Sequence, residues 1–238
     1  MFFIGEFNVL VTGSWDKTLK YWDTRQPQPV TNVQLPERVY CMDAGAPLLV
    51  VGTAERHVLI YDIRQPAKEF KLIQSPLKYQ TRAVANFIDK TGFALGSIEG
   101  RCAIHHVEDR DASRNFAFKC HRENDEIYAV NAIKFHPVYG TFATAGSDGT
   151  VHFWDKVYNR TSDVTHFTQD SKQRLKPFPK CNAPITACAF NGDGHIFAYA
   201  VGYDWSKGAE FNNPQYRSHI MLHPTPETEI KQKPPKKR

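Results

Sequence analysis

Short apolar runs separated by tight polar turns follow one another along the chain. In the middle of the sequence, AVNAIKF (129–135), TFATAGS (141–147) and TVHFW (150–154) predict three strands, separated by HPVYG and by Asp-Gly. Asp-Gly between two β-rich runs is a strong hairpin signal. The runs ITACAF (185–190) and HIFAYAVG (195–202), joined by NGDG, repeat this form. The pattern predicts antiparallel strands joined by short turns.

One phrase recurs at intervals of several tens of residues. Residues 13–23 read GSWDKTLKYWD and residues 146–155 read GSDGTVHFWD, with weaker copies at 52–62 and 96–106 and a looser one near Gly202. A Gly-Ser or Gly-Thr turn, a β-rich run and a closing aromatic-Asp pair at such spacing are typical of WD-type repeats. Each repeat forms one four-stranded blade of a β-propeller. The sequence therefore predicts an all-β fold, a WD-repeat β-propeller over residues 1–226.

The number of repeats predicts an incomplete ring. We expect about four and a half blades, because the first unit lacks an apparent opening strand. Residues 157–169, VYNRTSDVTHFTQ, interrupt a repeat directly after Trp-Asp-Lys. This atypical insertion begins with Val and ends with Gln, whose codons fit the ends of an intron, and one hypothesis is that a short intron is retained here.

Charge and cysteine content narrow the classes of protein. The formal net charge is +5, and a large part of it lies in residues 227–238, which we predict to be a basic, disordered tail. The five cysteines form no Cys-x-x-Cys pair, which fits reduced thiols. No apolar run reaches the length of a membrane-spanning helix. These features predict neither a membrane protein nor a disulfide-stabilised one.

The sequence contains no motif that would carry catalysis. Phosphate-binding loops of the Walker type, Gly-x-Ser-x-Gly and His-Glu-x-x-His are all absent. No His or Cys pair has the spacing of a metal site, so we expect neither a metal nor a cofactor. We predict that the protein is not an enzyme.

The Asp and Trp residues of the repeats have a structural interpretation first. Asp148 in the turn, Trp154 on the third strand and His121 before it are expected to form hydrogen bonds within one blade and so to satisfy buried polar groups. The same structural role is expected of Asp16, Trp22, Asp23 and Asp155.

Basic and aromatic residues near the predicted strand ends are the candidate binding residues. They are Arg82, Arg101, Phe118, Lys119, Trp154 and Lys156. One interpretation is that they are solvated loop charges and surface aromatics. The other is a face that pairs guanidinium groups with an acidic peptide, next to groups that stack on RNA.

A family resemblance favours the second interpretation. Six segments are distinctive: TGSWDKTLKYWDTR, LPERVYC, SPLKYQTR, GSIEGR, FKCHR and YDWSKG. They resemble the messenger-RNA export WD-repeat family, and the resemblance covers most of residues 9–156 and 181–211. A sister family, the mitotic-checkpoint WD-repeat proteins, shares several of these segments. YDWSKG (203–208) and WDTR (22–25) are similar to the export family rather than to its sister. Members of the export family have seven blades, so the resemblance implies about four and a half of an expected seven.

The resemblance also implies partners. Family members bind an acidic GLEBS motif of a nucleoporin, and Arg82 and Arg101 match the arginines expected to hold its glutamates. Phe118, Lys119, Trp154 and Lys156 match a basic, aromatic groove for RNA or ribonucleoprotein.

The family further implies a location in the nucleus, at the nuclear pore or envelope, and in the cytoplasm. Ubiquitin-ligase or checkpoint partners are a further expectation. The predicted function is a non-enzymatic adaptor in mRNA export, and the alternative is a spindle-checkpoint scaffold that binds GLEBS motifs of checkpoint kinases. A fragment that does not fold alone also stays open.

Overall fold

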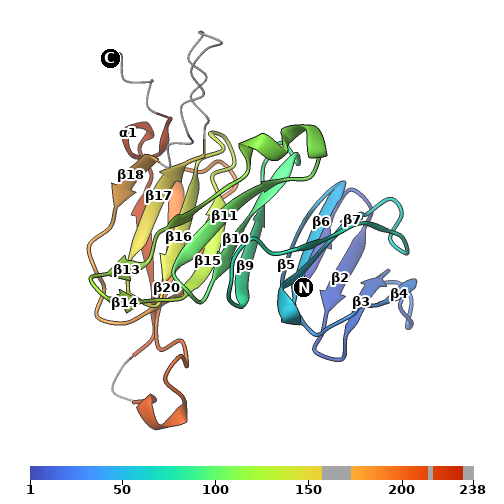
Figure 1. Cartoon of the computed structure of the whole chain (residues 1–238), viewed down its shortest axis with the longest axis horizontal. Helices are drawn as coiled ribbons and strands as arrows, with labels where there is room; N and C mark the ends of the chain where they lie inside the picture. Colours follow the sequence, from blue (N-terminus) through green and yellow to red (C-terminus); the bar gives the residue numbers. More distant parts are fainter. Residues whose placement is uncertain (157–172, 214–216, 233–238) are drawn as a thin grey trace.

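The computed structural model describes residues 1–156, 173–213 and 217–232, in which antiparallel strands build five sheets side by side (Figure 1). The sheets follow one another in chain order, and we number them blades 1 to 5. Blades 1 to 4 have four strands each and blade 5 has three. A separate two-stranded hairpin lies between blades 3 and 4 in the sequence.

The strands are short and make up about half of the described chain. Blades 1 and 2 consist of β1 (Phe2–Ile4), β2 (Val9–Gly13), β3 (Thr18–Trp22), β4 (Thr31–Gln34), β5 (Val39–Gly45), β6 (Leu48–Thr53), β7 (His57–Asp62) and β8 (Glu69–Gln74). Blade 3 and the hairpin consist of β9 (Thr81–Asn86), β10 (Gly92–Ser97), β11 (Arg101–His106), β12 (Phe116–Lys119), β13 (Arg122–Glu123) and β14 (Glu126–Ile127). Blades 4 and 5 consist of β15 (Val130–Phe135), β16 (Phe142–Gly146), β17 (Val151–Asp155), β18 (Gln173–Pro177), β19 (Ile185–Phe190), β20 (Ile196–Val201) and β21 (His219–Pro224).

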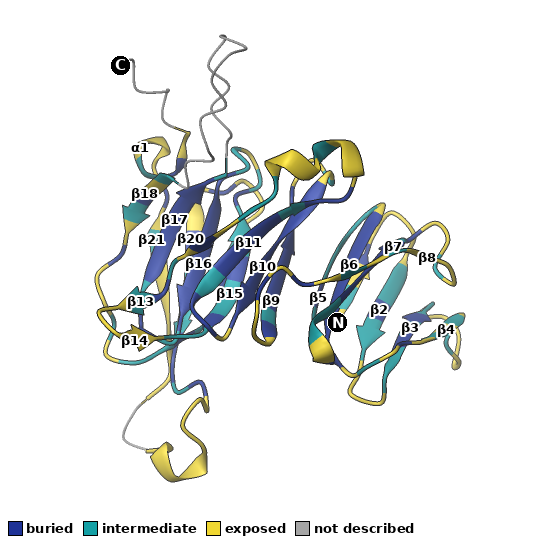
Figure 2. Cartoon of the chain, viewed as in Figure 1, coloured by how far each residue is buried: buried dark blue, intermediate teal, exposed yellow. Residues whose placement is uncertain are grey.

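Neighbouring blades pack face to face through apolar side chains. Leu49 and Val51 of β6 belong to the cluster between blades 1 and 2, whereas Leu48 and Val50 belong to the cluster between blades 2 and 3. Successive side chains of a strand point to opposite faces, so β6 is buried on both sides (Figure 2). Two further clusters join blades 3 and 4 and blades 4 and 5. The first strands of successive blades contact one another along the inner side of the row.

The predicted all-β WD-repeat propeller is confirmed, and the described blades form an open row rather than a closed ring. The expectation that the first blade lacks its opening strand is wrong. Strand β1 pairs with β2, with Ile4 opposite Val9, and completes four strands. This strand has only three residues and precedes the first WD phrase, so the repeat pattern gave no signal for it. The described residues therefore form five blades, and among these the last has three strands instead of four.

The predicted disordered tail is wrong for its first residues. Residues Glu227–Ile230 form the short helix α1, and Ile230 is completely buried against blades 4 and 5. The Thr141 hydroxyl donates a hydrogen bond to the backbone carbonyl of Ile230 at 2.8 Å, and the Lys176 ammonium lies 2.8 Å from the Glu229 carboxylate. These contacts fasten the segment to blade 4.

Two predicted segments lie outside the described residues: the insertion at 157–169 and the last six residues of the tail. Among the described residues, no helix is long and apolar enough to cross a membrane.

Removing the side chain of Ile230 should destabilise the fold. Because this side chain is 0% exposed, we expect Ile230→Ala to lower the free energy of unfolding by about 2–4 kcal/mol, measured by urea denaturation. Ile220 is the matched control, because it is 71% exposed on β21, and Ile220→Ala should change the free energy by less than about 0.5 kcal/mol. Equal effects of the two substitutions would contradict the anchoring role of α1.

Candidate functional site

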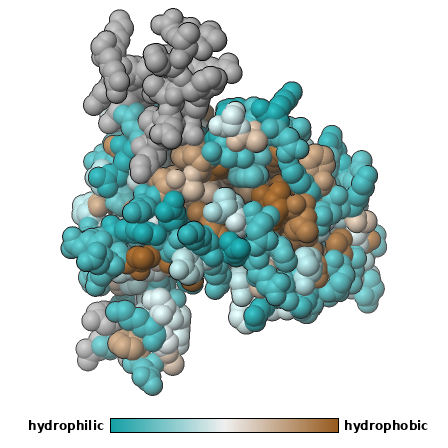
Figure 3. All heavy atoms as spheres, in the orientation of Figure 1, coloured by the Kyte–Doolittle hydropathy of each residue, from teal (hydrophilic) through white to brown (hydrophobic). Residues whose placement is uncertain are grey.

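One end of the blades gathers the turns between second and third strands together with the connections from blade to blade. We call this end the turn face; it is formed by residues 14–17, 35–38, 54–56, 75–80, 98–100, 120–129, 147–150, 178–184 and 202–213. Its parts are joined by backbone hydrogen bonds, from Cys120 N–H to the Gly100 carbonyl and from Ser147 N–H to the Ala129 carbonyl, both at 3.0 Å. It lies at the lower end of Figure 1, and hydrophilic residues dominate there in Figure 3.

Arg82 and Arg101 both lie on blade 3 next to the turn face. Arg82 is the second residue of β9, and Arg101 is the first residue of β11, with β10 between the two strands. Adjacent strands are 4.7–4.9 Å apart, which places the two backbones about 10 Å from each other. Both side chains are half-buried. The structure therefore brings the two predicted peptide-binding residues together on one blade.

Neither guanidinium group has a hydrogen bond or an ion pair with a described residue, in contrast to other arginines of the chain. Arg122 donates two hydrogen bonds to the Glu99 carbonyl, at 3.0 and 2.8 Å. Arg64 forms an ion pair with Asp62 at 2.5 Å. The donors of Arg82 and Arg101 are thus available for an acceptor outside the described chain.

Arg82 also lines a pocket of about 290 Å³ between the inner strands of blades 1 to 4. Tyr40 and Met42 of β5, and Asn131 and Lys134 of β15, contribute to its wall. The Lys134 ammonium lies 3.8 Å from the Asp43 carboxylate, so its charge is partly compensated. Arg82 is the arginine of this wall, and it has no such partner among the described residues.

Phe118 and Trp154, which were predicted to stack on RNA, both have buried rings. Their exposed fractions are 3% and 5%, and their ring centroids are 4.9 Å apart in the cluster between blades 3 and 4. A nucleobase cannot reach either ring face without opening this interface. The two side chains stabilise the packing of the blades.

Lys119 and Lys156, the other two residues of the predicted RNA groove, lie at opposite ends of the blades. Lys119 is exposed on β12, directly opposite Arg101 and so beside the turn face. Lys156 follows the last residue of β17, which starts at the turn face and runs away from it. The ammonium group of Lys156 lies 4.3 Å from the ring centroid of Phe87, and burial lowers the pKa of this lysine. The four residues therefore do not form one surface.

The predicted hydrogen bonds of the WD repeat are confirmed, with Thr144 as their link. One ring nitrogen of His121 (Nδ1) lies 2.9 Å from the Asp148 carboxylate and the other (Nε2) 2.9 Å from the Thr144 hydroxyl, which also accepts from Trp154 Nε1–H at 2.8 Å. Burial opposes the ionisation of Asp148, but hydrogen bonds from His121 and Thr150 and the charge of His121 outweigh it, so the pKa of Asp148 is lowered. Blade 1 shows the same contact, from Trp22 Nε1–H to Thr12 at 2.8 Å.

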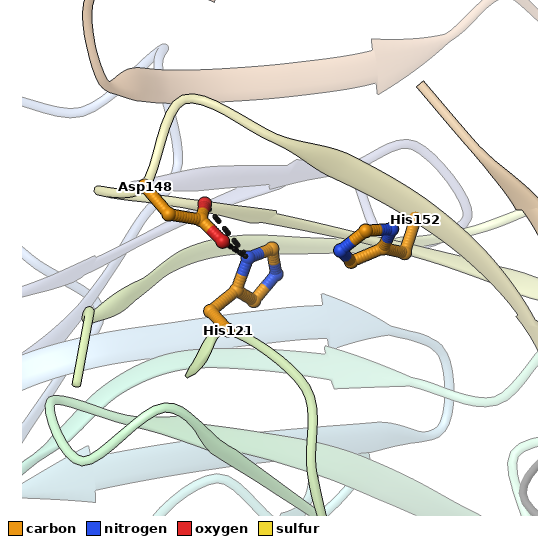
Figure 4. A group of neighbouring side chains, drawn as sticks. All are labelled: His121, Asp148 and His152. Carbon is orange, nitrogen blue, oxygen red and sulfur yellow. Dashed lines mark hydrogen bonds and ion pairs between the residues drawn. The ribbon is translucent and has the colours of Figure 1, made fainter. Parts of the chain in front are cut away.

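His121, Asp148 and His152 bring potential metal-ligand atoms within 4.8 Å of one another (Figure 4). Both ring nitrogens of His121 already have partners, which are Asp148 and Thr144. A metal ion would have to replace the contact with Asp148 that joins the turn to the blade. The arrangement therefore fits a structural network better than a metal site.

One exposed feature of the turn face lies outside the predicted binding residues. Trp205 and Phe211, in the long loop between β20 and β21, are 59% and 58% exposed. The segment YDWSKG, which contains Trp205, contributed only to the family resemblance. The signal available in the sequence was a hairpin connection far longer than two residues that contains several aromatic side chains.

Comparisons with known proteins agree with this architecture. The family model "WD domain, G-beta repeat" matches residues 3–23 and 113–155. The chain is 53% identical, over 99% of its length, to the Poly(A)+ RNA export protein of Schizosaccharomyces pombe. It is 53% identical, over 94% of its length, to the mRNA export factor GLE2 of Chaetomium thermophilum, and 55% identical, over 89%, to Protein RAE1 of Arabidopsis thaliana.

The chain belongs to the messenger-RNA export family of WD-repeat proteins. It covers 64%, 60% and 57% of these three relatives, and so spans about three fifths of their length. The export-family resemblance of the sequence is thereby confirmed.

The buried histidine of this network predicts a pH-dependent stability. Burial lowers the pKa of His152 from 6.5 to about 4, and neighbouring His121 adds to the effect. Between these pH values the unfolded chain binds a proton that the folded chain does not, so the free energy of unfolding falls as the pH falls. The contribution of His152 is up to about 3 kcal/mol.

His152→Gln should make this dependence shallower, as measured by urea denaturation between pH 7 and 4. His105, whose pKa burial also lowers to about 4, keeps its own contribution in the variant. His219→Gln at an exposed position is the control and should keep the wild-type slope. An unchanged slope in the His152 variant would show that this residue does not carry the effect.

Proposed function

We propose that the chain is a non-enzymatic adaptor in nucleocytoplasmic mRNA export that binds the acidic GLEBS motif of a nucleoporin on its turn face. The observation that carries the proposal is the pair Arg82 and Arg101, two half-buried guanidinium groups on one blade without a partner among the described residues. The names of the relatives, which are mRNA export proteins, support the cellular role.

The chemistry of the two residues suits glutamates of an extended peptide. A guanidinium group presents paired N–H donors that match a carboxylate. A hydrogen bond to a charged group contributes about 1.5–3 kcal/mol. Carboxylates on an extended chain can reach both arginines, because residues of one side of such a chain recur about every 7 Å. Arg82 and Arg101 thus serve as the electrostatic contacts of the adaptor.

RNA or ribonucleoprotein cargo is proposed to associate weakly or through the bound partner. The rings of Phe118 and Trp154 are buried, and Lys119 and Lys156 lie at opposite ends of the blades. Lys119, exposed beside Arg101, is the member of this group that phosphate can approach on the turn face. An adaptor of this kind acts in the nucleus, at the nuclear pore and in the cytoplasm.

A spindle-checkpoint scaffold would use the same two arginines for the GLEBS motifs of checkpoint kinases. The printed names of the relatives favour the export role. Titration of the chain with both kinds of GLEBS peptide distinguishes the two functions by their affinities.

Substitution of either arginine should weaken peptide binding. We expect Arg82→Ala and Arg101→Ala each to raise the Kd for a nucleoporin GLEBS peptide roughly ten- to a hundredfold, measured by fluorescence anisotropy with a labelled peptide. Added salt should weaken wild-type binding, because part of the affinity comes from charge.

Arg64→Ala is the matched control, because Arg64 forms an ion pair with Asp62 at the other end of blade 2. It should leave the Kd unchanged. Wild-type affinity in the double variant Arg82→Glu, Arg101→Glu would refute the proposed face.

A further inference from the structure

The loop between β20 and β21 is the longest described connection of the turn face, from which it projects at the bottom of Figure 1. Its described part continues from Gly202 through a turn of 3-10 helix, Ala209–Phe211. Other turns between second and third strands have three or four residues, as at 98–100 and 147–150. A hairpin needs no such length, so the extra residues call for another explanation.

This loop is fastened to the turn face through Asp204. The carboxylate is buried and accepts hydrogen bonds from Asn131 Nδ2–H at 3.0 Å, from Ser206 N–H at 3.2 Å and from the Ser147 hydroxyl. Asn131 belongs to β15 and Ser147 to the turn after β16, so blade 4 holds the loop at two points. The loop therefore starts from a fixed point.

Contacts within the loop hold its aromatic side chains in place. The Tyr203 hydroxyl donates to the Gly208 carbonyl at 2.7 Å and accepts from Lys207 N–H at 3.1 Å. The rings of Tyr203 and Trp205 lie 5.7 Å apart, and the Lys207 ammonium lies 5.7 Å from the ring centroid of Phe211. The loop is thus a braced unit that presents two exposed rings.

Trp205 combines exposure with backbone strain. Its φ is +61°, in the left-handed region that is unfavourable for a bulky side chain. Burial of the Trp205 ring within the chain does little to offset this strain, because the side chain is 59% exposed. Strained residues held by their surroundings cluster at binding sites. The geometry thus indicates that Trp205 is positioned to contact a partner.

The loop adjoins the pocket that contains Arg82. Asn131 lines this pocket and also donates a hydrogen bond to Asp204, the residue before Trp205. One side chain therefore connects the arginine site with the base of the aromatic loop. A peptide bound at Arg82 would pass Asn131 to reach the loop.

We infer that Trp205 and Phe211 form the apolar anchor of the peptide site: the acidic segment held by Arg82 and Arg101 carries an aromatic or large aliphatic side chain that packs on these two rings. This anchor rests on the proposed function. It adds a second requirement for the partner peptide, an apolar side chain beside its acidic residues. A peptide suits the loop better than RNA, because its two basic residues, Lys207 and Arg217, are balanced by Glu210 and the buried Asp204. Single-stranded RNA requires a positively charged groove beside the rings.

The test uses the full chain and the labelled nucleoporin GLEBS peptide, titrated by fluorescence anisotropy at low and high salt. Trp205→Ala and Phe211→Ala should each raise the Kd roughly thirtyfold or more, as truncation of an aromatic hot spot does. Because this contact is apolar, the fold-change should be similar at both salt concentrations, whereas that of Arg82→Ala should shrink as salt rises. Phe70→Ala is the control, since Phe70 is a 57% exposed ring on β8.

Trp205→Gly separates binding from folding. Glycine adopts positive φ without strain, so this variant should keep or raise the melting temperature while it loses affinity like Trp205→Ala. Wild-type affinity of the Trp205 variants, together with weakened binding by the arginine variants, would overturn the anchor and leave the proposed function standing.

Two other results are also decisive. Absence of peptide binding by the wild-type chain would overturn both the proposed function and the anchor. If Trp205→Ala instead abolished binding of a labelled oligouridine and left peptide binding intact, the loop would be an RNA contact and the anchor would be refuted.

Discussion

Packing between neighbouring blades is the constraint on which the rest of the structure depends. The second strand of an inner blade is buried on both sides, as β6 shows, where Leu48 and Val50 serve one interface and Leu49 and Val51 the other. A blade of this kind cannot bury its faces alone and needs neighbours on both sides. The stacking also fixes the orientation of every blade, so that equivalent turns meet at one end. The turn face, and the pairing of Arg82 with Arg101 on it, follows from this repeated packing.

The same constraint decides which residues are available for binding. Phe118 and Trp154 combine aromatic rings with basic neighbours in the sequence, yet both rings fill the interface between blades 3 and 4. Trp154 is held further by its hydrogen bond to Thr144, which His121 and Asp148 support. Rings that the blades need for packing are not free for a ligand. Exposed rings occur instead where a loop leaves the repeat, as at Trp205.

Features carried by the repeat could be predicted from the sequence, and those outside it could not. The WD phrase predicted the blades, the structural role of Asp148 and the place of Arg82 and Arg101 near strand ends. Strand β1 precedes any phrase, and Ile230 is one apolar residue in a basic segment, so neither gave a periodic signal. The burial of Phe118 could not be predicted from the sequence for another reason. Strand alternation separates it from Lys119, but which face meets the next blade depends on tertiary packing.

An electrostatic site of two arginines needs a second kind of contact to be selective. Exposed ion pairs contribute little and are screened by salt, and many acidic segments would satisfy two guanidinium groups equally well. Apolar contacts beside the arginine site discriminate between peptides by shape. They also exclude water around the charged pairs, and this strengthens the ion pairs. The hydrogen bond from Asn131 to Asp204 links the wall of the Arg82 pocket to the base of the Trp205 loop. The two arginines and the exposed rings of the loop therefore fit a single extended partner that contacts both. Two separate partners, one for each feature, would explain this link less well.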